Sequence, residues 1–220
     1  MNKIKRNYQN DYPSVTQIID MWRKPELEMW FKFNTLEFIN EESNKAKAIG
    51  TTLHEAIQAH IDNTDAEIQT DYPDEVKITI QSFLLFRKEH PEIKLSRSEI
   101  QLTSEKWHYN GTIDVKETRN FIGDWKTGKC GHKKNGEIVY DDKPKIYESH
   151  IIQIAAYKNL WEEKEKISLD GGWIAVFAKD KVAYNFQVFE RRELVQYFRY
   201  CFLTALEKYK FMEVGKIKRG

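Results

Sequence analysis

Two short motifs place charged side chains inside segments that are typical of β-strands. Asp114 lies in the run Gly111–Val115, and Asp124 and Lys126 lie in the run Gly123–Lys129. Aspartate is disfavoured in strands, and a buried carboxylate is costly unless it is paired or bound to metal. Asp124 and Lys126 are two residues apart, so they point to one face of their strand. Two carboxylates and an ammonium on adjoining strands therefore predict a site for a divalent cation and an anionic substrate.

Further side chains could complete this site. Glu99 alternates with the apolar Ile100 and Leu102, so we expect it to point away from the core, toward a second metal or its bound water. Mg²⁺ prefers oxygen ligands, whereas the nitrogen of His54 is more natural for Mn²⁺. Lys126 could hold or deprotonate an attacking water, or offset charge that builds on a phosphate.

The bulk composition limits the class of protein. The chain has 220 residues, of which 40% are hydrophobic, which is enough for one domain with a core. Its 35 basic and 34 acidic residues leave a net charge of +1, which argues against a protein that coats nucleic acid along its whole surface. An enzyme that grips a short stretch of backbone needs only a local basic lining.

Cysteine content and hydropathy exclude several cofactors and locations. Two cysteines, Cys130 and Cys201, predict reduced thiols rather than a disulfide framework. They are too few for an iron–sulfur cluster, so we expect none. We also expect no membrane span and no secretory signal, because the basic N-terminus is not followed by an apolar run. The expected location is intracellular, in a bacterial or phage-infected cell.

Helical periodicity dominates the first part of the chain and strand alternation the middle. A strong helix is predicted over Asn44–Ile61, with Gly50 inside it at a cost of about 1 kcal/mol relative to alanine. The other predicted helices are Val15–Trp22, Glu26–Phe38, Glu75–Glu89, Ile146–Glu163 and Arg191–Met212. The predicted strands are Leu95–Thr103, Trp107–Glu117, Asn120–Thr127, Gly172–Ala178 and Val182–Phe189.

This order predicts a single domain over residues 1–220, of α/β class with a mixed sheet. Residues 1–92 form a mainly helical N-terminal part that carries His54. Residues 93–190 form the sheet core with the charged motifs, and residues 191–220 form a closing helix and a basic tail. The segment Gly128–Lys145 shows no period and is predicted to be a loop. Its lysines are candidates for binding nucleic acid: Lys129, Lys133, Lys134 and Lys145.

The order of these motifs resembles that of the PD-(D/E)XK nuclease superfamily, and within it the RecB-type nucleases. The matching residues are Gly50–His54, Glu99, Gly111–Asp114, Asp124–Gly128 and Gln153–Tyr157. The opening Pro13–Thr16 is also similar to that of the mitochondrial genome-maintenance exonucleases and their phage relatives. The sequence departs from the pattern at Ile113, where the superfamily motif has proline.

The resemblance implies a restriction-endonuclease-like αβββαβ core that cleaves phosphodiester bonds with Mg²⁺ or Mn²⁺. Asp114 and Asp124 would be metal ligands, joined by His54 and Glu99. Lys126 would be the catalytic lysine. Gln153 and Tyr157, which share one helix face, would orient it or the nucleic acid. The implied activity is that of an exonuclease on DNA ends or single strands, working with replication, recombination or repair proteins.

Two other functions remain open from the sequence. One is an endonuclease of the same superfamily, of restriction or structure-specific type. The other is a catalytically silent DNA-binding or adaptor subunit, which is disfavoured because every expected catalytic position is filled. The aromatic residues Trp22, Trp30, Phe31 and Phe33 could stack on unpaired bases, but we expect them to pack in the core.

Overall fold

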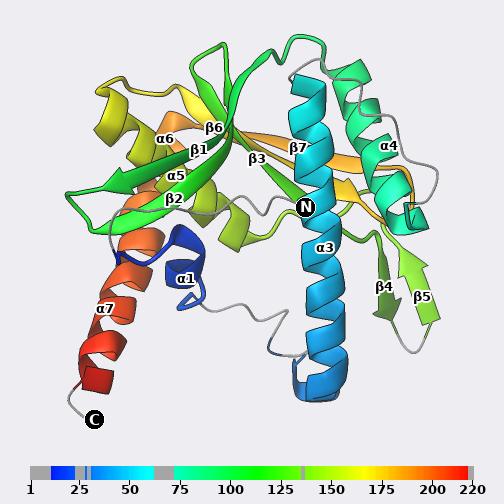
Figure 1. Ribbon diagram of the computed structural model, residues 1–220, viewed down its shortest axis with the longest axis horizontal. Coiled ribbons are helices and arrows are strands. Elements are labelled where there is room, and N and C mark those ends of the chain that lie inside the picture. Colours follow the sequence, from blue (N-terminus) through cyan, green and yellow to red (C-terminus); the bar gives the residue numbers. More distant parts are fainter. Residues whose placement is uncertain (1–10, 23–27, 29–30, 62–71, 135–136, 218–220) are drawn as a thin grey trace.

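A computed structural model describes residues 11–22, 28, 31–61, 72–134 and 137–217 (Figure 1). Its first helices are α1 (Val15–Ile19), α3 (Leu36–Ile61) and α4 (Asp74–Glu89). The following strands are β1 (Leu95–Ser104), β2 (Tyr109–Glu117), β3 (Phe121–Gly128), β4 (Gly131–Lys134) and β5 (Glu137–Tyr140). Helix α5 (Glu148–Glu165) leads to β6 (Gly171–Ala178) and β7 (Tyr184–Glu190). The chain then runs through α6 (Arg191–Gln196), the π-helix η1 (Tyr197–Phe202) and α7 (Leu203–Ile217).

The described strands form a five-stranded mixed sheet in the order β1-β2-β3-β6-β7. Strands β3 and β6 are parallel, and the other neighbouring pairs are antiparallel. The parallel pair needs a crossover, which α5 provides. Every residue of β6 is buried, because helices cover both faces of the sheet there. This order of elements confirms the predicted fold class and its αβββαβ core.

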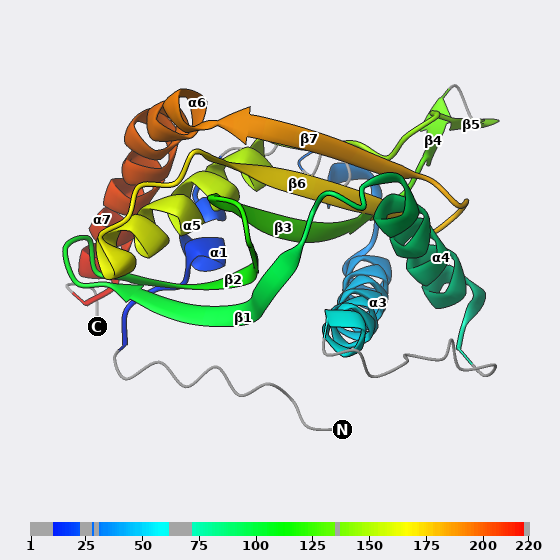
Figure 2. The same ribbon diagram turned by 90° about the horizontal axis from the view of Figure 1, so that it is seen from above.

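Two separate cores hold the helices on opposite faces of the sheet. Figure 2 shows α5, α6 and α7 on one side and α3 with α4 on the other. Successive β6 residues alternate between these cores, since Ile174 packs with the α5 side and Trp173 with the α4 side. On the α3 side, Leu53 and Ile57 are almost fully buried. Each such side chain contributes about 1.5–3 kcal/mol, so together they fix the second half of α3 against the sheet.

The first half of α3 differs from the prediction. The helix begins at Leu36 rather than Asn44, and its start projects beyond the sheet (Figure 1). Phe31 and Phe33 are 52% and 71% exposed, so the expectation that they pack in the core is wrong. Trp30, and most of the predicted helix that contains it, lie outside the described residues.

Two predicted segments also need correction. The predicted loop Gly128–Lys145 contains the hairpin of β4 and β5, whose start is fixed by Asp180, which accepts from the backbone N–H groups of Cys130 and Gly131. The closing helix is interrupted by a π-helical turn, in which the Leu203 N–H donates to the carbonyl of Phe198, five residues earlier. In the described part of the chain, no helix has the length and apolar character needed to cross a bilayer.

Candidate metal centre

The side chain of His54 is held over the sheet by its helical neighbours. Leu53 and Ile57 anchor α3 in the core formed with Trp125. The residue next to a buried anchor on a helix lies at the edge of the packed stripe, and His54 is accordingly 29% exposed. The helix thus delivers an imidazole to the rim of the sheet.

Two carboxylates flank this imidazole. His54 Nδ1 lies 2.9 Å from Oε1 of Glu99, and His54 Nε2 lies 3.9 Å from Oδ2 of Asp114. One ligand atom from each of the three residues lies within 4.8 Å of the other two. The sequence places these residues 45 and 60 positions from His54, so only the fold brings them together.

Strand register explains how the carboxylates meet. The pairs Ser98↔Val115 and Ile100↔Ile113 place Glu99 opposite Asp114 across β1 and β2. Glu99 has a left-handed backbone, with φ at 50°. That conformation is uncommon for a residue with a side chain and costs of order 1–3 kcal/mol, and it turns up most often at functional sites.

Asp114 also lies where β2 and β3 part. Their register pairs Val115 with Gly123, and beyond that pair the ladder does not continue toward Asp114. Instead, Oδ2 of Asp114 accepts a hydrogen bond of 2.8 Å from the backbone N–H of Trp125. The carboxylate therefore takes the place of a strand partner, and this bond holds it at the opening between the strands.

Asp124 and Lys126 form a second, adjoining unit. Their side chains make an ion pair on the β3 face opposite Gly123 and Trp125. Asp124 is fully buried, and its Oδ1 has no hydrogen-bond partner among the described residues. Asp124 is not part of the group formed by His54, Glu99 and Asp114, although the charges of His54 and Asp114 act on it. The structure thus brings three of the four predicted metal ligands together and places the fourth beside them, paired with the lysine.

Burial and charge set the protonation of these groups. Burial raises the pKa of Asp124 to about 7, with a smaller contribution from the Asp114 charge, even though Lys126 opposes the rise. Burial lowers the pKa of His54, but the charges of Asp114 and Glu99 outweigh it, so the pKa lies above its ordinary value. The pKa of Lys126 is also raised, because Asp124 and Asp114 outweigh its desolvation. The acidic groups thus favour the charged forms of His54 and Lys126, whereas burial disfavours the charged form of Asp124.

The donor set suits a divalent cation. Two atoms that ligate one ion at about 2.0–2.2 Å can lie at most about 4.4 Å apart. The 3.9 Å between His54 Nε2 and Asp114 Oδ2 fits within this limit. The Nδ1 of His54 is engaged by Glu99, and metal-binding histidines commonly donate their second nitrogen to a carboxylate in this way. His54 and Asp114 could therefore hold an ion directly, while Glu99 orients the imidazole.

Gln153 and Tyr157 lie on one face of α5, as their spacing predicts. The Nε2 of Gln153 donates to the Tyr157 hydroxyl at 2.7 Å. Tyr157 packs so closely on β2 that a Cβ at Gly111 would come within 2.9 Å of its ring. The pair thus braces the start of β2, the strand that carries Asp114.

The predicted nucleic-acid lysines are spread around the hairpin. Lys129 lies 3.7 Å from Glu42, and Lys145 lies 3.8 Å from Asp141. Lys133 and Lys134 belong to β4. Figures 1 and 2 show β4 at the opposite end of the molecule from β1 and β2, the strands that carry Glu99 and Asp114.

Lys179 is a charged residue that the sequence analysis missed. It follows the last residue of β6 and is 92% buried, given an exposed fraction of 8%. In the sequence it looks like an ordinary turn residue between Ala178 and Asp180.

Comparisons with known proteins support the fold alone. No protein-family model matches the sequence, and no curated protein matches it. The chain is similar to the crystal structure of a candidate exonuclease from Eubacterium rectale, with a TM-score of 0.51 and 14% identity, over 100% of this chain and 86% of that one. It also matches a phage-related exonuclease from Haemophilus somnus with 14% identity over 94% and 96% of the two chains, but that TM-score of 0.44 adds no argument.

Proposed function

We propose that the chain is a metal-dependent DNA nuclease of PD-(D/E)XK type. The observation that carries the proposal is the meeting of His54, Glu99 and Asp114 beside the buried Asp124–Lys126 pair. The likeness in fold to a candidate exonuclease supports it. The substrate would be DNA ends or single strands, and the reaction hydrolysis of the phosphodiester bond.

Each residue would have a distinct task. Asp114 and His54 would hold the cation, Asp124 would join them as its carboxylate turns from Lys126, and Glu99 would fix the imidazole or reach a bound water. A bound Mg²⁺ or Mn²⁺ would polarise the phosphate and acidify a water. The nitrogen ligand favours Mn²⁺ over Mg²⁺.

Lys126 would act at the reacting phosphate. Its side chain is 22% exposed, and its ammonium remains charged near neutral pH because its pKa is raised. A charged lysine cannot remove a proton from water, so its task would be to position the attacking water and offset charge on the phosphate. Lys129 and the lysines of the hairpin would contact flanking phosphates.

The test is cleavage of end-labelled single- and double-stranded DNA in Mg²⁺, Mn²⁺ or EDTA, with Asp124→Ala as the inactive control. We expect cleavage from the ends in Mn²⁺, none in EDTA, and none in the variant. A circular single strand should remain intact, and its cleavage would indicate an endonuclease instead. The absence of both metal-dependent cleavage and Mn²⁺ binding in calorimetry would overturn the proposal and favour a silent binding subunit.

A further inference from the structure

The face of α3 that carries His54 has no acidic side chain. Successive residues of an α-helix are about 100° apart around the axis, so residues three, four, seven and eleven positions before His54 share its face. In α3 these residues are Thr51, Gly50, Lys47 and Ser43. The acidic residues of the helix lie about 100° or more from His54: Glu37, Glu41, Glu42 and Glu55. An anion could therefore lie along this face, which we call the His54 face, without meeting a carboxylate of α3.

Gly50 lies on the His54 face without a neighbour that requires its small size. It is four residues before His54, which is about 6 Å along the helix axis. Among the described residues, a Cβ at Gly50 would meet nothing within 4 Å. Glycine inside a helix is less favourable than alanine, so a glycine with open space in front of it weakens the helix without improving its packing. A ligand that approaches the helix backbone closely would account for it.

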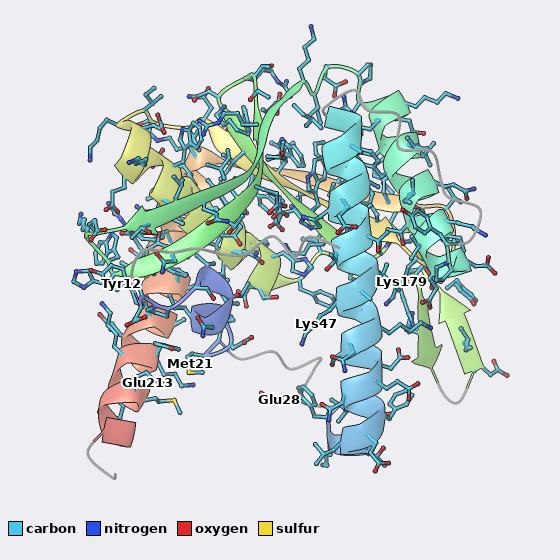
Figure 3. The ribbon with its side chains drawn as sticks, viewed as in Figure 1. Tyr12, Met21, Glu28, Lys47, Lys179 and Glu213 are labelled. Atoms are coloured by element: carbon cyan, nitrogen blue, oxygen red, sulfur yellow. The ribbon has the colours of Figure 1, made fainter. Side chains whose placement is uncertain are left out.

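Lys47 places a positive charge on the same face, about 10 Å along the axis from His54. Figure 3 shows Lys47 on the side of α3 where α1 lies, and Figures 1 and 2 show β1 and β2 on that side as well. Lys47 is exposed, and no hydrogen bond or ion pair within the described part of the chain engages its ammonium. Lys45, on another face of α3, pairs with Glu75 instead. The charge of Lys47 is thus available to an anion near the candidate metal centre.

The His54 face also begins at the candidate metal centre. His54 meets Asp114 there, and the part of α3 that carries Lys47 runs from that point to the end that projects beyond the sheet (Figure 1). A nucleic-acid strand with one phosphate at the metal centre could continue along α3, past Gly50 and then Lys47. It would not have to cross to another face of the helix or of the sheet.

We propose that the His54 face of α3 binds the nucleic-acid backbone next to the cleaved bond. Gly50 is the point where the backbone comes closest to the helix, and Lys47 binds a flanking phosphate. This inference rests on the proposed nuclease function and adds to it the residues that position the strand. Both residues act in substrate binding and not in the chemical step. Contacts with the sugar–phosphate backbone carry no base specificity.

The first test adds a side chain to the His54 face. The binding of a fluorescent single-stranded oligonucleotide is measured by anisotropy in EDTA, which prevents cleavage. We expect Gly50→Gln to bind about tenfold more weakly than wild type, because the new side chain occupies the space of the strand. Gly50→Ala should fall between the two. Ala48→Gln introduces the same side chain at an exposed position on another face of α3 and should bind as wild type does.

The second test removes the charge of Lys47. We expect Lys47→Met to lose about 0.7 from the slope of log K against log salt, the value for one phosphate contact to a single strand. Lys47→Arg should retain most of the affinity. Lys88→Met is the control, since it removes the same charge from an exposed position near the end of α4, and it should bind as wild type does.

Thermal unfolding separates this role from a structural one. Gly50→Ala should melt at the same or a higher temperature than wild type although it binds more weakly, because a glycine kept for a ligand lowers the stability of the helix. Wild-type affinity in Gly50→Gln, or an unchanged salt slope in Lys47→Met, would overturn the inference. If Gly50→Gln unfolds, Gly50→Ala replaces it, and wild-type affinity in that variant overturns the inference equally. If wild type binds no oligonucleotide at all, the nuclease proposal itself fails, which is a different outcome from equal binding by wild type and variants.

Discussion

His54 Nδ1 and Glu99 Oε1 lie 2.9 Å apart, and this contact directs the other imidazole nitrogen toward Asp114. If Glu99 orients the histidine, Glu99→Gln keeps an oxygen acceptor but loses the charge that strengthens the bond. We expect about a tenfold loss of Mn²⁺ affinity, within the range typical of such orienting groups. His54→Ala should lower the Mn²⁺ affinity further, because it removes a direct ligand. Calorimetric titration of both variants with Mn²⁺ measures the difference, and equal losses would make Glu99 a direct ligand.

Asp114 has two separable tasks, which Asn and Ala substitutions distinguish. Asp114→Asn should abolish Mn²⁺ binding yet keep an oxygen that accepts from the Trp125 N–H. Asp114→Ala should also leave that buried N–H without its acceptor, at a cost of about 1–3 kcal/mol. Denaturant unfolding in EDTA should therefore rank Asn above Ala in stability. Equal stability of the two variants would show that the hydrogen bond does not support the strand opening.

The Asp124–Lys126 pair predicts a pH-dependent stability in the metal-free protein. Burial raises the pKa of Asp124 to about 7, so between about pH 4 and pH 7 the folded chain holds a proton that the unfolded chain has released. This contribution to stability falls as pH rises through that window. Lys126→Met removes the charge that opposes the rise in the pKa of Asp124. The pH range in which the folded chain holds the extra proton should therefore extend above pH 7.

The expected result is that Lys126→Met destabilises the protein more at pH 8 than at pH 5. One pKa unit corresponds to about 1.4 kcal/mol, which sets the scale of the difference. Denaturant unfolding in EDTA at the two pH values measures it. The double variant Asp124→Asn with Lys126→Met is the control, because it has no carboxylate to titrate. If Lys126→Met lowers the free energy of unfolding equally at both pH values, the pKa of Asp124 does not depend on Lys126.

Alanine substitutions at two glycines should change the stability of the protein in opposite directions. A Cβ at Gly50 would meet nothing within 4 Å, so Gly50→Ala should stabilise α3 by about 1 kcal/mol. A Cβ at Gly123 would come within 2.1 Å of the Trp173 ring, which is buried and hydrogen-bonded to Glu117. Gly123→Ala should therefore destabilise the protein by about 1–3 kcal/mol. Melting temperatures of the two variants test the pair, and a stable Gly123→Ala would mean that Trp173 can move.

The sequence predicted those parts of the molecule that depend on local periodicity. Each predicted strand of the main sheet is present, and the α/β class follows from their order. Phe31 and Phe33 were misjudged because apolar residues at helical spacing do not reveal whether another element covers them. The hairpin was missed because its strands have only four residues each, too few for alternation to be recognised.

In the candidate site, too, local spacing predicts some relationships between residues, whereas others depend on tertiary packing. Asp124 and Lys126 could be related by their spacing on one strand, and Gln153 and Tyr157 by their spacing on one helix. The contact between His54 and Glu99 could not, because it depends on how α3 docks on β1. Lys179 was missed for a different reason: its burial depends on how α4 packs at the end of β6, where the Ser82 hydroxyl donates to the carbonyl of Ala178, and no pattern near Lys179 reveals this.

His54 belongs to α3 and Asp114 to β2, so an ion bound by both would link the helix to the sheet. Metal binding would then stabilise α3 against local unfolding, because the ion binds only where the helix is docked on the sheet. Amide hydrogen exchange in the second half of α3 would then slow in saturating Mn²⁺ and quicken in chelator. The cation would therefore stabilise the docking of α3 on the sheet as well as take part in the reaction. At low cation concentration, α3 would unfold locally more often.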